Sequence, residues 1–349
     1  MLNKIIEEDL AYITSAKLNW DQLRNKTILV SGAAGFLPSY FIETLLYLNA
    51  NFDMNIRIIG LVRSLEKAKI KFKHHLYNEA LQLIAHDVCN EYITTESIDY
   101  IIHAASQATP RVFGTDPVGT LLPNVVGTAM LLNLAKQKKV TEFIFFSTSG
   151  VHGYVDESCI PIKENCSGYL DFTDVKSCYL ESKRMGENMC MAWMQQYGTP
   201  VKIIRPSITY GPGVKLDDGR SYADFIANIL DNKDITLYSN GQVIRNFCYV
   251  ADATLGFFTI LLEGKSGQAY HVAAEQEISI FDLATFLVSD IFKDRNLKVK
   301  MVIDETKQYP RTDFPRNSVN LDMLKNLGWS LNFSLRDGFT RTIKSYEMK

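Results

Sequence analysis

The chain has 349 residues, of which 46% are hydrophobic and 22% are charged. This is the composition of a globular protein with a sizeable core, and it excludes global disorder. The length suggests about two domains, or one large α/β domain with an appendage. Because 37 Lys and Arg face 39 Asp and Glu, the net charge of -2 gives no electrostatic signal for nucleic acid or an anionic membrane.

Several other classes are also disfavoured by the sequence. The first residues, MLNKIIEED, lack the basic start and apolar stretch of a signal peptide, and no apolar run approaches the roughly 18–20 residues of a membrane span. Six dispersed cysteines without a CxxC pair favour free thiols in a reducing cytoplasm. The histidines show no metal-ligand spacing, and His74 and His75 are expected on a solvated, Lys-rich surface. We therefore expect a cytoplasmic protein with no metal ion and with neither nucleic acid nor membrane as a partner.

The chain begins with a polar segment, residues 1–25, whose apolar positions have helical spacing and predict an amphipathic N-terminal extension. Residues 27–31 then form a continuous apolar run, which is typical of a strand buried on both faces of a parallel sheet. Strands and helices alternate from there to residue 205. The expected strands are 27–31, 56–62, 80–84, 100–103, 143–147 and 201–204, and the expected helices are 38–48, 64–76, 121–138 and 177–196. This alternation predicts crossover units and a doubly wound parallel α/β sheet.

We expect residues 26–205 to form a dinucleotide-binding domain of the Rossmann type. Turn-rich segments and mixed short elements follow, so residues 206–349 are expected to form mainly a smaller α/β substrate-binding region. Part of that region, about 245–265, could return to the first domain.

A glycine-rich turn lies between the first strand and the next helix. Gly32 permits a tight turn, and Gly35 lets the backbone approach a pyrophosphate at the positive end of the helix. A GxxG alone is weak evidence, but its position after a buried strand strengthens it. Asp87 follows the third strand, where a carboxylate could meet an adenine amino group. Ala104 and Ala105 follow the fourth strand and would let a cofactor lie close, whereas the nearby His103 is expected to be a core histidine.

Tyr179 and Lys183 are four residues apart and therefore lie on one helix face. A phenol titrates near 10, and an adjacent ammonium lowers that pKa, so the pair predicts proton transfer. The fifth strand ends near Thr148, whose hydroxyl could orient a substrate oxygen beside the phenol.

These residues resemble the extended short-chain dehydrogenase/reductases, in the NAD-dependent epimerase/dehydratase family that acts on nucleotide sugars. The resemblance spans roughly residues 26–345, and several segments look most like UDP-glucuronate decarboxylases. Its motifs are Gly32 with Gly35, His103-Ala104-Ala105, Asp116-Pro117, Asn124-Val125-Val126-Gly127-Thr128, Ser147-Thr148-Ser149, Tyr179 with Lys183, Tyr210-Gly211-Pro212-Gly213, Asp218-Gly219-Arg220, Arg245 to Asp252 and Leu327-Gly328-Trp329.

The resemblance implies an NAD-dependent enzyme that oxidises a nucleotide sugar, usually at C4, and works through a transient ketone. The catalytic residues would be Thr148, Tyr179 and Lys183, and the substrate would also contact Arg220, Arg245, and Arg311 or Arg316, because guanidinium groups suit a diphosphate. The cofactor would contact Gly32, Gly35, Phe36, Leu37, Arg63, Asp87, Val88, Ala104, Ala105, Tyr179 and Lys183. Relatives also pair as homodimers through the helices at 121–138 and 177–196.

Departures from the family pattern leave alternatives open. Pro38 stands where a third glycine is usual, and proline is tolerated at a first helical position. The second strand ends at Arg63 without the acid that selects the NAD ribose, so NADP is an alternative.

Ser149 and Gly150 replace the acidic residues of dehydratases and decarboxylases. We therefore rank an epimerase first, a decarboxylase second and a 4,6-dehydratase third. A dehydratase would need an acid from elsewhere, with Glu181 and His152 nearest in sequence. A non-catalytic dinucleotide sensor is disfavoured because Tyr179 and Lys183 are present.

Overall fold

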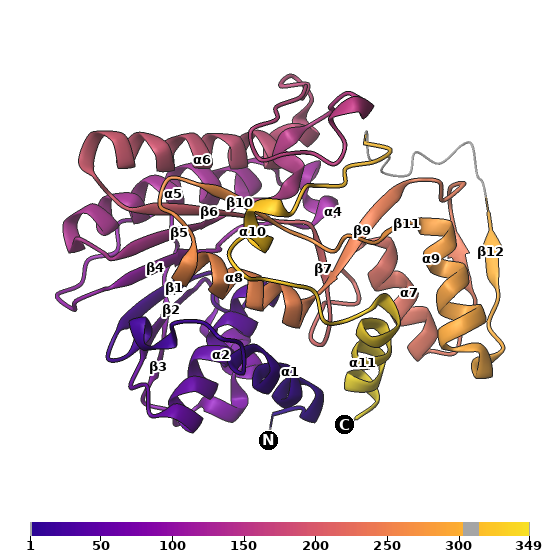
Figure 1. Cartoon of the computed structure of the whole chain (residues 1–349), viewed down its shortest axis with the longest axis horizontal. Coiled ribbons are helices and arrows are strands. Elements are labelled where there is room, and N and C mark those ends of the chain that lie inside the picture. Colours follow the sequence, from indigo (N-terminus) through magenta and orange to yellow (C-terminus); the bar gives the residue numbers. More distant parts are fainter. Residues whose placement is uncertain (1, 303–313, 349) are drawn as a thin grey trace.

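A seven-stranded parallel sheet lies at the centre of the computed structural model, which describes residues 2–302 and 314–348 (Figure 1). Its strand order is β10-β6-β5-β4-β1-β2-β3. The strands are β1 (Thr27–Ser31), β2 (Arg57–Val62), β3 (Leu81–Ala85), β4 (Tyr100–His103), β5 (Glu142–Phe146), β6 (Val201–Pro206) and β10 (Ala269–Val272). The order runs outward from β1 in both directions, so the doubly wound fold expected from the sequence is confirmed.

Both faces of the sheet are covered by helices, which explains the continuous apolar runs of the strands. In β1, Ile28 belongs to one core cluster and Leu29 to the other, since successive side chains point to opposite faces. The first face packs against α2 (Phe36–Phe52), α3 (Leu65–Lys71) and α8 (Val250–Glu263). The second packs against α5 (Pro117–Lys138) and α6 (Cys178–Tyr197), seen together above the sheet in Figure 1.

The N-terminal extension contains α1 (Lys4–Thr14), as its apolar spacing predicts. Asn3 caps the helix by accepting a hydrogen bond from Ile5 N. The helix packs against α2, α8 and the C-terminal helix α11 (Leu335–Glu347), so the two ends of the chain lie close together (Figure 1).

The C-terminal half is divided between the large sheet and a smaller region. Helix α8 and strand β10 pack in the large sheet layer, whereas strand β9 lies in a separate sheet of order β11-β9-β7. The remaining strands are β7 (Ile208–Tyr210), β8 (Ile235–Leu237), β9 (Ile244–Tyr249), β11 (Glu277–Ser279) and β12 (Val299–Met301). The remaining α-helices are α4 (Pro110–Phe113), α7 (Ser221–Leu230), α9 (Ile280–Phe286) and α10 (Asp322–Lys325).

Within the described ranges, α5 is the one helix that is long and apolar enough to cross a membrane by length and composition. Its sequence is not one unbroken apolar run, because Pro123, Asn124 and Gly127 interrupt the apolar residues. In the fold α5 packs against α6 and β4, which is the setting of a core helix. All six cysteines are free thiols.

Candidate active site

The predicted site residues gather where β1, β4 and β5 end, at the carboxyl edge of the sheet. The strand order reverses between β1 and β4, and such a switch point is where open α/β sheets bind ligands. Ser31 ties the two strands together there. Its hydroxyl accepts hydrogen bonds from Ala104 N and Ala105 N, each 3.1 Å away, and lies 2.8 Å from His103 Nδ1.

The glycine-rich turn fits a dinucleotide pyrophosphate. Gly32 has a φ of +67°, and a Cβ there would lie 2.7 Å from Ala105 Cα, so only glycine suits this position. Gly35 is the N-cap of α2 and offers no side-chain cap. The first-turn amides of Phe36 and Leu37 are therefore left for an anion.

Helix α2 begins at Phe36, two residues earlier than expected. Pro38 is thus the third residue of the helix and not the first. It is still tolerated because the amide of that residue belongs to the first turn, where it has no intrahelical acceptor.

The other predicted cofactor residues lie beside this turn at neighbouring strand ends. Arg63 follows β2 and is exposed, so its guanidinium is accessible to a ribose phosphate. Asp87 follows β3 and is exposed, and its carboxylate accepts from Cys89 N at 2.9 Å. Val88 is buried against α5, where a Cβ on Gly127 would lie 2.8 Å from its side chain.

His103 is a core histidine, as the sequence analysis expected. Its side chain is 1% exposed, and Nε2 lies 3.1 Å from the Thr128 hydroxyl. Burial lowers the pKa of His103 to about 3, so the ring is neutral and serves to join β4 to α5.

Thr148, Tyr179 and Lys183 are brought together between the end of β5 and the first turns of α6. The Thr148 side chain lies near enough to the Tyr179 phenol to lower its pKa. The Tyr179 ring stacks on Phe113 of α4, with centroids 4.9 Å apart and planes 9° from parallel. Lys183 Nζ donates to Phe146 O at 2.5 Å and lies 6.0 Å from the centre of the Tyr179 ring.

The electrostatics of this pair differ from the sequence expectation. Burial raises the pKa of Tyr179, and the opposing influences are the positive charge of Arg220 and the nearby Thr148 side chain. Lys183 is not the cation that opposes the shift, because its ammonium points to Phe146 O. Burial lowers the pKa of Lys183 itself to about 7, and the charge of Glu187 opposes that change.

Two supporting residues on α6 were missed by sequence reasoning. Ser182 accepts a hydrogen bond from Asn124 Nδ2 at 3.0 Å and donates to Tyr179 O at 2.8 Å, so it fixes α6 against α5. Glu187 holds Arg205 through two hydrogen bonds of 2.9 and 2.6 Å. A signal for Glu187 was available, since it stands four residues after Lys183 on the same helix face.

The predicted substrate arginines fall in different places. Arg220 lies near Tyr179, and its Nη2 donates to Ala108 O at 2.5 Å. Arg245 is buried in β9, and burial lowers its pKa to about 10. Arg316 is exposed and forms two hydrogen bonds of 2.8 and 2.7 Å with Glu277. Arg311 lies outside the described residues.

Gly150, two residues after Thr148, leaves little room for an acidic side chain as the neighbouring side chains stand. A Cβ on Gly150 would lie 2.8 Å from Leu180 Cδ2, so a larger residue there requires Leu180 to move. The alternative acid His152 is also engaged, because Nδ1 lies 2.7 Å from Cys166 O and Nε2 lies 2.7 Å from His271 Nε2. Glu181 pairs with Arg184 at 3.4 Å.

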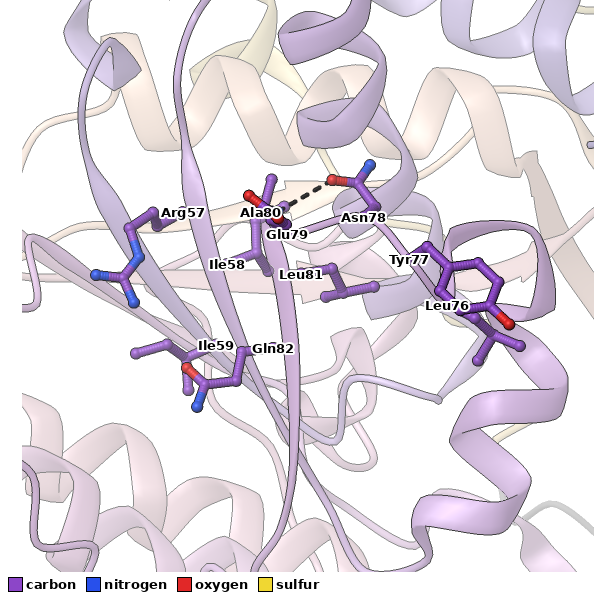
Figure 2. Close-up of a pocket in the computed structure, with 10 residues that line it drawn as sticks. All are labelled: Arg57, Ile58, Ile59, Leu76, Tyr77, Asn78, Glu79, Ala80, Leu81 and Gln82. Carbon is purple, nitrogen blue, oxygen red and sulfur yellow. Dashed lines mark hydrogen bonds between the residues drawn. The ribbon is translucent and has the colours of Figure 1, made fainter.

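Two cavities lie outside this cluster. One of about 420 Å³ lies at the amino ends of β2 and β3, where Arg57, Leu81 and exposed Tyr77 line it (Figure 2). That is the opposite edge of the sheet from Gly32. The other, of about 470 Å³, lies behind α6 against Glu187 and Arg205.

Comparisons with known proteins identify the family of this chain. The model of the "NAD dependent epimerase/dehydratase family" matches residues 28–273. UDP-glucuronic acid decarboxylase 6 of Arabidopsis thaliana is 31% identical over 93% of this chain and 90% of its own length. UDP-glucuronic acid decarboxylase 1 of Xenopus tropicalis is 29% identical over 91% of this chain and 71% of its own.

Solved structures show the same fold. A UDP-glucuronic acid 4-epimerase mutant from Bacillus cereus superposes with a TM-score of 0.78 at 22% identity, covering 92% of this chain and 99% of its own. The dTDP-glucose 4,6-dehydratase DesIV from Streptomyces venezuelae superposes with a TM-score of 0.76 at 24% identity, covering 92% and 97%. Since the family model covers more than half of the residues, and the glycine-rich turn, Thr148, Tyr179 and Lys183 occupy one edge of the sheet, this chain belongs to the NAD dependent epimerase/dehydratase family.

Proposed function

We propose that this protein is an enzyme that uses NAD to modify a nucleotide sugar through a transient ketone at C4. The observation that carries the proposal is the placement of Thr148, after β5, beside Tyr179 in the first turn of α6, at the same sheet edge as the glycine-rich turn. Family membership supports the cofactor, and the curated and solved relatives support the substrate class.

The dinucleotide would be held by Gly32, by the amides of Phe36 and Leu37, and by the Ala104–Ala105 segment. When bound, the nicotinamide supplies an acceptor for a hydride and returns it later. Arg63 makes NADP the alternative cofactor, since a guanidinium suits a 2′-phosphate. Titrations of wild type and Arg63→Ala with NADH and NADPH distinguish the two cofactors. If the enzyme uses NADP, Arg63→Ala binds NADPH more weakly than wild type does. If the enzyme uses NAD, the variant and wild type bind NADH with the same affinity.

Tyr179 is proposed as the base that removes the proton from the sugar hydroxyl. Thr148 orients that hydroxyl through its own side chain, and Arg220 favours the charged phenolate from the opposite side. Lys183, fixed by Phe146 O, is proposed to hold the cofactor ribose. Arg245 and Arg316 are proposed to neutralise the substrate diphosphate, which requires Arg316 to leave Glu277.

Epimerisation is the reaction that these residues support best. It requires oxidation, rotation of the ketosugar and reduction on the other face, and it needs no further acid. Elimination of water needs a general acid for the leaving hydroxyl, and such an acid typically contributes about 10²–10⁴-fold. Ser149 cannot supply it, and Gly150 is packed against Leu180.

Decarboxylation of a nucleotide uronic acid is the second candidate. A β-keto acid loses CO₂ with little assistance once it has formed. The nearness of Arg220 to Tyr179 favours a substrate that carries a carboxylate, and the curated relatives described above are named as decarboxylases.

One experiment separates the reactions. Purified protein is incubated with UDP-, dTDP-, GDP- and CDP-sugars, including uronic acids, and the products are analysed by mass spectrometry and NMR. Epimerisation leaves the mass unchanged and alters a sugar coupling pattern, decarboxylation removes CO₂, and dehydration removes water. A 4-keto-6-deoxy product, or no turnover of any nucleotide sugar together with no dinucleotide binding, would contradict the proposal.

A further inference from the structure

Two adjacent histidines and a buried glutamate converge between α2 and the turn that follows α3. His74 and His75 form the short turn after α3, and Glu43 projects from α2. His74 Nε2 lies 2.9 Å from Oε1 of Glu43, and His75 Nε2 lies 2.8 Å from Oε2. Within residues 2–302 and 314–348 this is the one group of three metal-ligating side chains whose ligand atoms all lie within 4.8 Å of one another.

The sequence expectation of a solvated surface is wrong for these histidines. Phe72, two residues before His74, is fully buried and draws the turn inward against α2. The side chains are 13% exposed for His74, 20% for His75 and 8% for Glu43. The site is therefore shielded but still reachable from solvent at the imidazole side.

The chemistry of the three groups suits a borderline divalent cation. Imidazole nitrogens and a carboxylate oxygen are ligands of Zn²⁺, at about 2.0–2.2 Å, and two histidines with one glutamate leave a fourth position for water. Ligand atoms around a tetrahedral ion stand roughly 3.3 Å apart at those bond lengths. The two present N–O separations would each need to widen by about half an ångström, and the ligand atoms already lie within 4.8 Å of one another. Both imidazoles would then present Nε2 without its proton, which neutral histidine allows through the other tautomer.

Lys71 is the charged neighbour of this group. Its ammonium is attracted by the Glu43 carboxylate, while burial and the charge of Lys215 act against that ammonium. The Glu43 carboxylate therefore has positive charge nearby in addition to the two imidazoles.

We propose that Glu43, His74 and His75 form a divalent metal site of the zinc class that ties the turn after α3 to α2. The site is independent of the proposed reaction, since its residues are separate from Gly32, Thr148 and Tyr179. Its role is structural: an ion bound only by the folded protein stabilises that fold by mass action.

The test uses the full chain, stripped with a chelator and then given Zn²⁺ or Co²⁺. We expect one ion per chain, a visible absorption spectrum of low-symmetry Co²⁺ and a higher melting temperature with Zn²⁺. Because loss of an outer-shell partner already costs 10–100-fold in affinity, His74→Gln or His75→Gln is expected to weaken binding by at least about 100-fold. His86→Gln is the matched control, since His86 Nε2 lies 3.2 Å from Asn90 O in a different turn.

One further variant sharpens the outcome. Glu43→Gln keeps the side-chain size and should abolish the Co²⁺ spectrum, while circular dichroism reports whether the chain folds. If Glu43→Gln does not fold, the two histidine variants on the partly exposed turn give the result instead. Zn²⁺ bound equally by wild type and by the double variant His74→Gln/His75→Gln would overturn the proposal.

Discussion

Tyr179 and Lys183 stand on one face of α6 but meet different partners. The Tyr179 hydroxyl lies near Thr148 and Arg220, whereas the Lys183 ammonium donates to Phe146 O and is influenced by Glu187. Four-residue spacing places two side chains on the same side of a helix, yet it does not determine which groups they contact. Burial shifts both pKa values most, and the residues that oppose these shifts come from the segment after β5, from α6 and from the segment that precedes α7.

Tyr179→Phe is expected to abolish turnover while the cofactor stays bound. The substitution removes the proton-transfer hydroxyl but keeps the ring that stacks on Phe113. General acid–base groups contribute about 10²–10⁴-fold, so the rate constant should fall by at least that factor. Steady-state kinetics and a dinucleotide titration measure the two effects. Turnover close to that of the wild type would show that another group is the base.

Lys183 predicts a specific dependence of stability on pH. Its folded-state pKa of about 7 lies below the ordinary value of 10.5, so the unfolded chain binds the proton more tightly between these values. Stability contributed by the neutral amine therefore rises with pH through this window, by at most about 1.4 kcal/mol per pH unit.

Lys183→Met lacks this titration and is the control. Denaturant unfolding at pH 7 and pH 9 should show wild type gaining roughly 2 kcal/mol relative to Lys183→Met. An equal difference in unfolding free energy at both pH values would mean that Lys183 keeps an ordinary pKa.

At the level of elements, α1 is held by a buried polar cluster that joins four parts of the chain. Asp9 of α1 is fully buried and accepts hydrogen bonds from Tyr40 of α2 at 3.1 Å and Tyr249 of β9 at 2.8 Å. Arg341 of α11 completes the cluster with a 2.7 Å hydrogen bond to the same carboxylate. Because these partners belong to both the large sheet layer and the C-terminal region, α1 links the two.

Asp9→Ala is expected to destabilise the protein by about 3–5 kcal/mol, since it leaves Arg341 and two tyrosine hydroxyls without their buried acceptor. Denaturant unfolding followed by circular dichroism measures the loss. Asp9→Asn keeps an acceptor of the same size and should cost less than Asp9→Ala. A loss below about 1 kcal/mol in Asp9→Ala, the range typical of surface ion pairs, would show that α1 docks through its apolar face alone.

At the level of the whole molecule, α5 and α6 leave apolar side chains on their outer surface. Leu121 and Leu122 are each 37% exposed on α5, and Met185 is 49% exposed on α6. Met189 and Trp193, in contrast, pack against the core beneath the helices, so they are not free for a partner. A second copy of the chain could bury the exposed side chains of Leu121, Leu122 and Met185.

The homodimer expected through these helices remains a prediction. Light scattering at micromolar concentration should give twice the chain mass. Leu121→Glu combined with Met185→Glu should give the mass of one chain, because charges would be buried in the interface. Phe172→Glu, on the exposed loop before α6, is the control and should leave the mass unchanged. A wild-type mass of one chain would reject the dimer.

The sequence by itself determined the order and type of the main elements and the place of the site. Strand 27–31, the glycine-rich turn and the Tyr179–Lys183 spacing are local patterns, since hydrophobic period, turn chemistry and helix geometry each act within a few residues. The residues that come from distant segments were decided only by the tertiary structure. Arg220 approaches Tyr179, Leu180 closes the space at Gly150, and Glu43 meets His74 and His75. Such contacts depend on how packed layers bring remote segments together, and no local pattern in one sequence records that arrangement.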